Sequence, residues 1–441
     1  MTDRPHSENL KAAYYTLGCK LNFSETSTIG KMLRDRGVVR AQKGETPDIC
    51  IVNTCSVTEI ADKKGRSLIR RLHRLYPDAS IIVTGCYAQL KPKEVAALEG
   101  VDIVLGSNEK LRIVQYIDRW SKTRQQIVTT TSSLDIREFI PSCERGDRTR
   151  FFLKVQDGCD YYCTYCTIPY ARGRSRSGSI PALVEDARRA AGAGGKEIVI
   201  TGVNIGDFGR DTGEKFLDLL KALDKVEGIE RYRISSIEPN LLTPEILKWI
   251  ATEAKAFMPH FHIPLQAGSD KVLKLMNRRY DTSLFEERIK MVRQMIPDAF
   301  IGVDIIAGAR GESPEEWEKS LSFVKRLPIT RLHVFPYSER PGTKALSLEG
   351  AVSNEEKHRR VALLTAHSDH TLREFMESNR GSIRKILWEH PLADTGMMTG
   401  LTDNYIRVVA PYDPSKINTI TLARLDLIDP SRTETMLATH I

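Results

Sequence analysis

Three cysteines in the middle of the chain have a spacing that suits a metal cluster. Cys159, Cys163 and Cys166 form a C-x3-C-x2-C group in the segment GCDYYCTYC, directly after an apolar run. Three thiolates on one tight loop can bind three irons of a 4Fe-4S cube and leave the fourth iron open for another ligand. The alternative is a zinc site, which would want a fourth protein ligand that this segment does not supply nearby.

A second set of three cysteines is spread over the first hundred residues. Cys19 lies in TLGCKLN, Cys55 in VNTCSVTE and Cys86 in VTGCYAQ, and each follows an apolar run that predicts a strand. Because the carboxyl ends of parallel strands meet at one edge of a sheet, we expect these thiols to converge there. The alternative is packing, since a free cysteine behaves as a small hydrophobe. Packing is the better explanation for Cys50, inside a predicted strand, whereas Cys143 lies in a polar linker.

The elements that must position these cysteines follow an α/β pattern. Apolar runs alternate with amphipathic stretches through residues 11–125, which predicts a doubly wound parallel sheet. Residues 145–375 repeat a strand-helix unit six times and predict a partial (β/α)6 barrel, because a full one needs eight units. Short strands with turns in residues 376–441 predict a small antiparallel β-barrel.

Length and composition are those of an ordinary globular protein. The 441 residues are 41% hydrophobic and 28% charged, which excludes collagen-like, coiled-coil and wholly disordered chains. The net charge of +8 permits an anionic partner. Residues 1–12 are charged where a signal peptide would be apolar, and no run of eighteen apolar residues occurs, so we expect a cytoplasmic protein with no membrane partner. In that setting clustered thiols favour metal or redox chemistry over disulfides.

The two cysteine triplets, followed by a small β-domain, resemble the radical S-adenosylmethionine methylthiotransferase family over essentially the whole chain. The segments QDGCDYYCTYCTIPYARGRSRS, TLGCKLN, NTCSVTEIADKK and FPYSERPGTKA look most like the branch that modifies N6-threonylcarbamoyladenosine beside the tRNA anticodon. The resemblance implies an N-terminal methylthiotransferase domain, a radical S-adenosylmethionine barrel and a C-terminal TRAM domain that contacts RNA. One departure is the segment 308–312, which reads GARGE where the family commonly has GFPGE. Its flanking Gly and Glu persist, so we expect the turn to survive.

The resemblance also implies a reaction, because carbon 2 of adenine carries an unactivated C–H bond that only a cofactor can break readily. A 4Fe-4S cluster on Cys159, Cys163 and Cys166 would reduce S-adenosylmethionine to give a radical that abstracts this hydrogen. A second 4Fe-4S cluster, on the N-terminal triplet, would carry an exogenous sulfur that a second S-adenosylmethionine methylates. The six cysteines are the expected catalytic and metal-binding residues. The implied partners are the anticodon stem loop of a tRNA and an electron donor such as a flavodoxin or ferredoxin.

Polar residues around the predicted barrel strands are candidates for binding S-adenosylmethionine. The segment GGKE at 194–197 precedes and opens a predicted strand, a place where the barrels of the resembled superfamily usually bind the methionyl amine. Polar residues that end strands can contact the rest of the molecule. The alternative is a helix-capping glycine pair and ordinary hydrogen bonds at sheet ends. The candidates are Gly194, Gly195, Glu197, Arg233, Ser235, Gln266 and Asp304.

Two groups of residues are candidates for RNA contact. Arg172, Arg174 and Arg176 alternate on a glycine-containing loop after the first cluster motif, and guanidinium groups bind phosphate in bidentate fashion. Tyr405 and Arg407 lie on a predicted exposed strand of the C-terminal domain. The alternatives are solvated surface charge and ordinary β-barrel surface.

The favoured function is transfer of a methylthio group to carbon 2 of N6-threonylcarbamoyladenosine in tRNA. A second enzymatic hypothesis keeps the chemistry and changes the substrate to isopentenyladenosine in tRNA or to an aspartate of a ribosomal protein. A hypothesis from another class is a redox sensor that binds RNA without catalysis. The open fourth position at each triplet counts against the sensor, since a structural cluster is more often closed by four cysteines.

Overall fold

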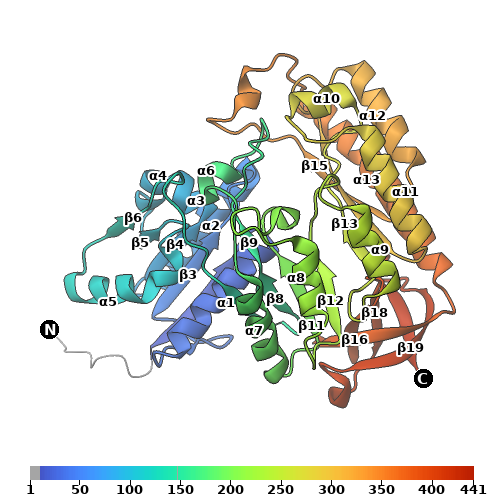
Figure 1. Ribbon diagram of the computed structural model, residues 1–441. Helices are drawn as coiled ribbons and strands as arrows, with labels where there is room; N and C mark the ends of the chain where they lie inside the picture. The colour runs from blue at the N-terminus through green and yellow to red at the C-terminus, as the bar shows by residue number, and fades with distance from the viewer. Residues whose placement is uncertain (1–9, 147) are drawn as a thin grey trace.

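The computed structural model describes residues 10–146 and 148–441 and contains three packed units (Figure 1). The first is a six-stranded parallel sheet, as the alternating pattern predicts. Its strands in spatial order are β2 (Val39–Arg40), β1 (Lys11–Thr16), β3 (Ile49–Thr54), β4 (Ser80–Gly85), β5 (Val101–Leu105) and β6 (Ile127–Thr129). β6 lies beyond the predicted limit of this unit at residue 125 and pairs with β5.

Helices cover both faces of this sheet, because each strand is apolar on both sides. One face packs against α1 (Lys20–Arg34) and α5 (Ile113–Thr123). The other packs against α2 (Glu59–Leu75), α3 (Cys86–Leu90) and α4 (Pro92–Ala96). Cys50 belongs to the second core and is fully buried, in agreement with the packing interpretation.

The central unit is a partial barrel of six parallel strands, which confirms the predicted fold class. Two arcs, β8-β11-β12 and β13-β14-β15, meet through a bridge between Ser236 and His262. No strand pair in the described ranges joins β8 to β15, so the barrel stays open between these two strands. The barrel strands are β8 (Phe151–Lys154), β11 (Glu197–Thr201), β12 (Arg231–Ile234), β13 (His260–His262), β14 (Phe300–Ala307) and β15 (Arg331–Pro336).

Helices follow the barrel strands and enclose a large apolar core. Several begin at a Ser, Thr or Asp that accepts a hydrogen bond from the first turn, as Thr243 and Ser313 do. The helices are α7 (Ile180–Gly192), α8 (Phe216–Leu223), α9 (Pro244–Thr252), α10 (Asp270–Leu275), α11 (Thr282–Met295), α12 (Pro314–Arg326) and α13 (Asn354–Ser378). Short elements complete the unit: β7 (Ser142–Glu144), β9 (Gln156–Asp157), α6 (Ile168–Arg172) and β10 (Arg176–Ser177).

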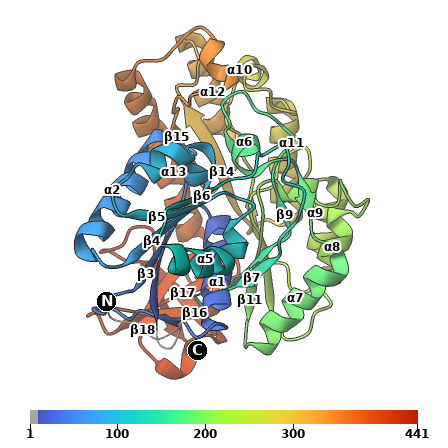
Figure 2. The ribbon, with the colours of Figure 1, turned by 90° about the vertical axis from the view of Figure 1, so that its left-hand side faces the viewer.

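The C-terminal unit is a closed five-stranded barrel that lies beneath the central barrel in both views (Figures 1 and 2). Its strand pairs are antiparallel except β18 with β20, which is parallel. The strands are β16 (Ile383–Leu392), β17 (Met397–Thr402), β18 (Arg407–Pro411), β19 (Ile420–Ile428) and β20 (Met436–His440). No helix among the described residues is long and apolar enough to cross a membrane.

The turn at residues 308–312, which differs in sequence from the family pattern, still forms. Gly308 and Gly311 both have positive φ, and the Gly308 amide donates to the Glu312 carboxylate at 2.6 Å. Arg360 of α13 donates to the same carboxylate at 2.8 Å. The flanking Gly and Glu therefore suffice to form this turn.

Candidate active site

The N-terminal cysteines meet at one edge of the sheet, as their positions after strands predict. Cys19 precedes α1 directly, Cys55 follows β3 and Cys86 begins α3. The strands before them, β1, β3 and β4, are neighbours in the sheet. Gly18 allows the close approach, because a Cβ at its φ of +102° would lie 2.7 Å from the Cβ of Cys55. Burial, followed by the neighbouring Cys86 and Cys19, raises the pKa of Cys55 to about 12.

The second triplet lies on the loop between β9 and α6, at the carboxyl end of the first barrel strand. Backbone amides of Tyr161 and Ile168 donate to the Sγ atoms of Cys159 and Cys166, each at 3.4 Å. Burial is the main cause that raises the pKa of both thiols to about 12. A metal that binds here must therefore displace their protons.

A cation stands beside the third thiol of this loop. Arg278 donates from Nη1 to the Sγ atom of Cys163 at 3.2 Å and also pairs with Glu238. Arg278 was not a candidate from the sequence, because it comes from a loop 115 positions further along the chain than Cys163.

The loops that carry the two cysteine triplets touch each other. The hydroxyl of Thr167, next to Cys166, lies 3.5 Å from the carbonyl oxygen of Ser56, which follows Cys55. Arg340, in the segment FPYSERPGTKA, binds the loop that follows Cys55. It donates to Ser56 Oγ at 2.8 Å and to Asp62 Oδ2 at 2.7 Å. The sequence marks that segment only through its resemblance to the family and predicts no role for Arg340.

A buried network of charges joins the N-terminal unit to the barrel beside the cysteines. Four cations surround two carboxylates, and every one of these side chains is almost fully buried. The network consists of Lys110, Lys154, Arg172, Arg176, Glu25 and Asp157. Burial lowers the pKa of Arg172, but its acidic neighbours together raise it by more, so that the net shift is upward. Glu25 and Asp157 contribute most to the rise, and Cys86 and Cys19 lie close enough to Arg172 to add to it.

This network provides a test of whether an iron-sulfur cluster fits the N-terminal triplet. The four cations exceed the two carboxylates in a place without bulk water, which is costly unless further negative charge lies nearby. Three thiolates holding a cluster would supply that charge next to Arg172. The donor set and its surroundings therefore fit an anionic thiolate-bound cluster.

The same network corrects the expected RNA contacts of Arg172 and Arg176. Arg172 is 1% exposed and donates to Asn22, Glu25 and Asp157, and Arg176 is bound to Asp157 and to backbone carbonyls. Their guanidinium groups are occupied inside the protein. Arg174, between them, is exposed.

A cavity of about 680 Å³ occupies the interior of the partial barrel. Cys19 and Lys20 line one side of it, and Ser235 and Asp304, two of the candidates for S-adenosylmethionine, line the other. Gln266 follows β13 with a φ of +67°, and its backbone carbonyl accepts a hydrogen bond from the Ile306 amide. These three candidates lie toward the carboxyl ends of the strands, where ligands of parallel sheets gather.

The other four cofactor candidates do not line this cavity. Gly194 and Gly195 precede β11 and Glu197 begins it, so they mark the amino end of that strand. Arg233 donates to Glu197 at 2.8 Å and to the carbonyls of Thr402 and Asp403 in the C-terminal barrel.

The expectation that Gly194, Gly195, Glu197 and Arg233 bind S-adenosylmethionine is therefore wrong. The carbonyl of Gly194 accepts from Asn418 of the C-terminal barrel at 2.9 Å, and a Cβ at Gly195 would lie 2.7 Å from the Ala190 carbonyl. These residues join the central and C-terminal units, and they do so away from the cysteine loop, which follows the carboxyl end of β8.

Tyr405 closes the base of the cavity and is not part of an exposed strand. Its ring lies 3.9 Å from that of His260, centroid to centroid, and its φ is +70°. Burial raises the pKa of Tyr405, but Lys20, Arg150 and Arg233 outweigh it, so that the net shift is downward. The prediction that Tyr405 contacts an RNA stem loop from an exposed strand is therefore wrong. Arg407, the other residue predicted there, is exposed.

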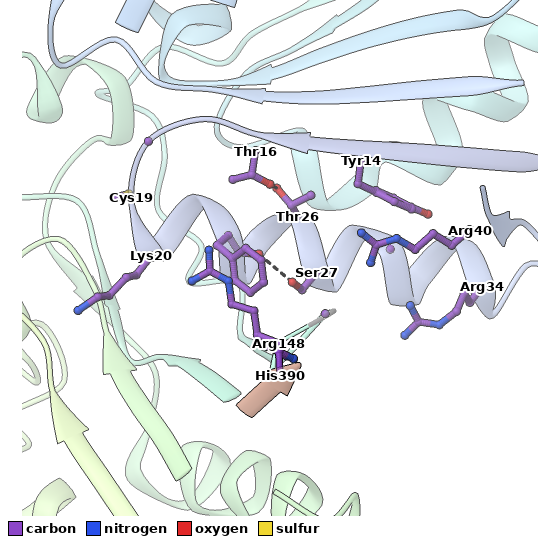
Figure 3. A pocket seen from close by; sticks show the side chains of 14 residues that line it. Tyr14, Thr16, Cys19, Lys20, Thr26, Ser27, Arg34, Arg40, Arg148 and His390 are labelled. Atoms are coloured by element: carbon purple, nitrogen blue, oxygen red, sulfur yellow. Dashed lines mark hydrogen bonds between the residues drawn. The ribbon is translucent and has the colours of Figure 1, made fainter. Parts of the chain in front are cut away.

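A second hollow, of about 590 Å³, runs along α1 and ends at Cys19 (Figure 3). Figure 3 shows Arg34 and Arg40 at one end, Arg148 and His390 beside Ser27, and Cys19 with Lys20 at the other end. None of the described residues that line this groove is acidic, and Tyr14 and Phe23 add aromatic surface. We call this hollow the α1 groove. Cationic and aromatic linings of this kind suit a nucleic-acid strand.

Comparisons with known proteins agree with this architecture. Residues 11–106 match the uncharacterized protein family UPF0004, and residues 153–324 match the radical SAM superfamily. Threonylcarbamoyladenosine tRNA methylthiotransferase MtaB of Bacillus subtilis (strain 168) is 39% identical over 406 residues, which are 90% of this chain and 89% of that protein. The protein of that name from Aquifex aeolicus is 36% identical, over 90% of this chain and 96% of its own.

More distant likenesses extend the comparison. A tRNA-2-methylthio-N(6)-dimethylallyladenosine synthase of Pelotomaculum thermopropionicum is 30% identical over 92% of this chain and 94% of its own. Among solved structures, the radical S-adenosylmethionine methyltransferase TsrM of Kitasatospora setae superposes with a TM-score of 0.56 at 14% identity, covering 77% of each chain. That structure supports the fold alone.

Proposed function

The chain belongs to the radical S-adenosylmethionine methylthiotransferase family, and from this premise we propose how its two cysteine triplets serve one reaction. The enzyme is a methylthiotransferase that modifies carbon 2 of N6-threonylcarbamoyladenosine in tRNA. The observation that carries the proposal is the contact between the two cysteine loops at Thr167 and Ser56. Substrate carbon placed between them would reach both triplets.

Cys159, Cys163 and Cys166 would hold the 4Fe-4S cluster of the radical S-adenosylmethionine unit, which supplies the electron that cleaves S-adenosylmethionine. Arg278 supports Cys163 with a charged hydrogen bond. We assign Ser235, Gln266 and Asp304 to the binding of S-adenosylmethionine, because they lie toward the carboxyl ends of the strands. A flavodoxin or ferredoxin is the proposed electron donor.

Cys19, Cys55 and Cys86 would hold a second 4Fe-4S cluster with a sulfur atom that is methylated and transferred. The excess of buried positive charge around Arg172 supports this assignment, as does the opening of Cys19 into both the barrel cavity and the α1 groove. Two molecules of S-adenosylmethionine would be used in each turnover, one for the methyl group and one for the radical.

The α1 groove is the proposed track of the tRNA backbone. Arg34, Arg40 and Arg148 line it, and phosphate contacts from such residues position a nucleic acid without reading its sequence. Arg174 and Arg407 are exposed and remain proposed as further RNA contacts. Since the substrate is tRNA, we propose that the enzyme works in the cytoplasm.

Nucleoside analysis tests this function directly. The reconstituted full chain is incubated without oxygen with S-adenosylmethionine, a reductant and tRNA that carries N6-threonylcarbamoyladenosine, and the digested nucleosides are weighed. We expect a methylthio mass gain on that nucleoside and none on matched tRNA with isopentenyladenosine. A gain only on isopentenyladenosine, or only on a ribosomal protein, would assign the enzyme to another substrate.

A further inference from the structure

The wall of the barrel cavity opposite Cys19 carries an unusual polar group. His262 of β13, Asp304 of β14 and His333 of β15 face one another, with their nitrogen and oxygen atoms all within 4.8 Å. Nε2 of His262 lies 2.7 Å from Oδ1 of Asp304. Buried polar side chains are costly unless they are hydrogen-bonded. His262 and Asp304 satisfy each other, whereas the ring of His333 has no hydrogen bond with any residue in the described ranges and can accommodate a ligand.

The charge of the cavity favours an anionic ligand. Its two carboxylates are both engaged, Asp304 with His262 and Glu434 with Arg331. Lys20 also lines the cavity and forms no ion pair with any residue in the described ranges. An ammonium group without a carboxylate partner leaves the cavity with excess positive charge, which would repel a metal cation at the two histidines.

The side chain of Lys20 points in a direction that suits binding of an anion in this cavity. In Figure 3 its side chain extends from the start of α1 away from Arg34 and Arg40, toward the strands of the central barrel. Burial is the main cause that lowers the pKa of His333 and of His260, and the charge of Lys20 adds to it. Lys20 also lowers the pKa of Tyr405, against the effect of burial. Lys20 therefore lines the same cavity as Cys19 and His333 and acts on the ring of His333.

The proposed substrate, N6-threonylcarbamoyladenosine, carries an anionic group of the kind that this cavity favours. The threonylcarbamoyl substituent ends in a carboxylate with a hydroxyl beside it, whereas an isopentenyl group has neither charge nor hydrogen-bonding atoms. Carbon 2 and the carbon that bears N6 flank the same ring nitrogen. When carbon 2 faces Cys19, the N6 substituent thus stays inside the same cavity.

We propose that Lys20 binds the carboxylate of the threonylcarbamoyl group and that His333 donates a hydrogen bond to it, so that these two residues select this nucleoside over uncharged N6 derivatives. The inference rests on the proposed function and deepens it. Burial and the neighbouring His262 lower the pKa of His333 to about 4, so its ring is neutral near pH 7 and retains one N–H donor. The His262–Asp304 pair forms the wall behind it.

Binding measurements on synthetic anticodon stem loops test the proposal. Three loops are compared with the full chain: one with N6-threonylcarbamoyladenosine, one in which its carboxylate is replaced by a carboxamide, and one with isopentenyladenosine. Because a hydrogen bond to a charged group contributes more than a neutral one, we expect about 10- to 100-fold tighter binding of the carboxylate than of the carboxamide. Lys20→Gln should remove this preference, Lys20→Arg should keep most of it, and His333→Gln should reduce it.

A control and a second readout separate the possible failures. Lys31→Gln removes one positive charge from an exposed position of the same helix and should keep the full preference. Iron content and melting temperature show whether Lys20→Gln still folds and loads. If the wild-type enzyme forms the methylthio product but binds carboxylate and carboxamide equally, or if Lys20→Gln keeps the preference, the subsite is wrong. If the wild type forms no such product on any loop, the proposed function itself fails.

Discussion

Replacing Glu25 by Gln tests whether the buried charge network holds the N-terminal unit against the barrel. Glu25 is fully buried, and its carboxylate lies 2.6 Å from Lys110, 3.2 Å from Lys154 and 3.1 Å from Arg172. Removing one partner of a buried ion pair leaves uncompensated charge and costs about 3–5 kcal/mol. For a domain of about 150–250 residues each kcal/mol lowers the melting temperature by roughly 2–4 °C, so a drop of about 6–20 °C is expected.

Thermal unfolding followed by circular dichroism measures this drop. The matched control is Asp35→Asn, which removes a carboxylate from an exposed pair with Lys31 and should change stability by less than about 1 kcal/mol. Lys110→Met added to Glu25→Gln should restore part of the loss, because it removes one of the unpaired cations. A melting temperature within about 2 °C of the wild type would correspond to a loss of only roughly 1 kcal/mol in the free energy of unfolding. That result would show that the network does not stabilise the interface.

Three further predictions concern other contacts. Arg340→Met breaks the bond to Asp62 beside Cys55 and should lower the iron content by up to half while S-adenosylmethionine cleavage persists; unchanged iron would contradict it. The pKa of His333 is lowered to about 4, so protonation of the unfolded chain below about pH 6.5 should erode stability as pH falls from about 6.5 toward 4, and His333→Gln should show a shallower decline of melting temperature. Arg34→Gln and Arg148→Gln should each weaken tRNA binding and lower the slope of log affinity against log salt by about 1, and an unaltered slope would remove the α1 groove as the RNA track.

The cysteine sites could be anticipated because their signals are local. The spacing of Cys159, Cys163 and Cys166 defines a single loop, and a parallel sheet brings positions such as Cys19 and Cys55 to one edge whatever the details of packing. The order of βα units likewise predicted the central barrel. These inferences need only neighbours in sequence and the regular geometry of strands.

The errors arose where a role depends on partners far along the chain. Arg172 looked like a surface arginine on a glycine-containing loop, but Glu25, 147 positions away, buries it. Glu197 was placed near the cofactor because of its Gly-Gly neighbours, although a residue that begins a strand lies at the amino end. Tyr405 adopts a left-handed backbone conformation that turns it into the base of the cavity, and no alternation pattern shows this.

Iron analysis of cysteine variants shows whether two separate three-cysteine sites bind clusters. After anaerobic reconstitution, the wild type should contain about eight irons per chain, and Cys19→Ala and Cys159→Ala should each contain about four, as two 4Fe-4S clusters require. Cys143→Ala, a control outside both triplets, should keep about eight. About four irons in the wild type with no loss in Cys19→Ala, or zinc in place of iron, would mean that the N-terminal triplet holds no iron-sulfur cluster.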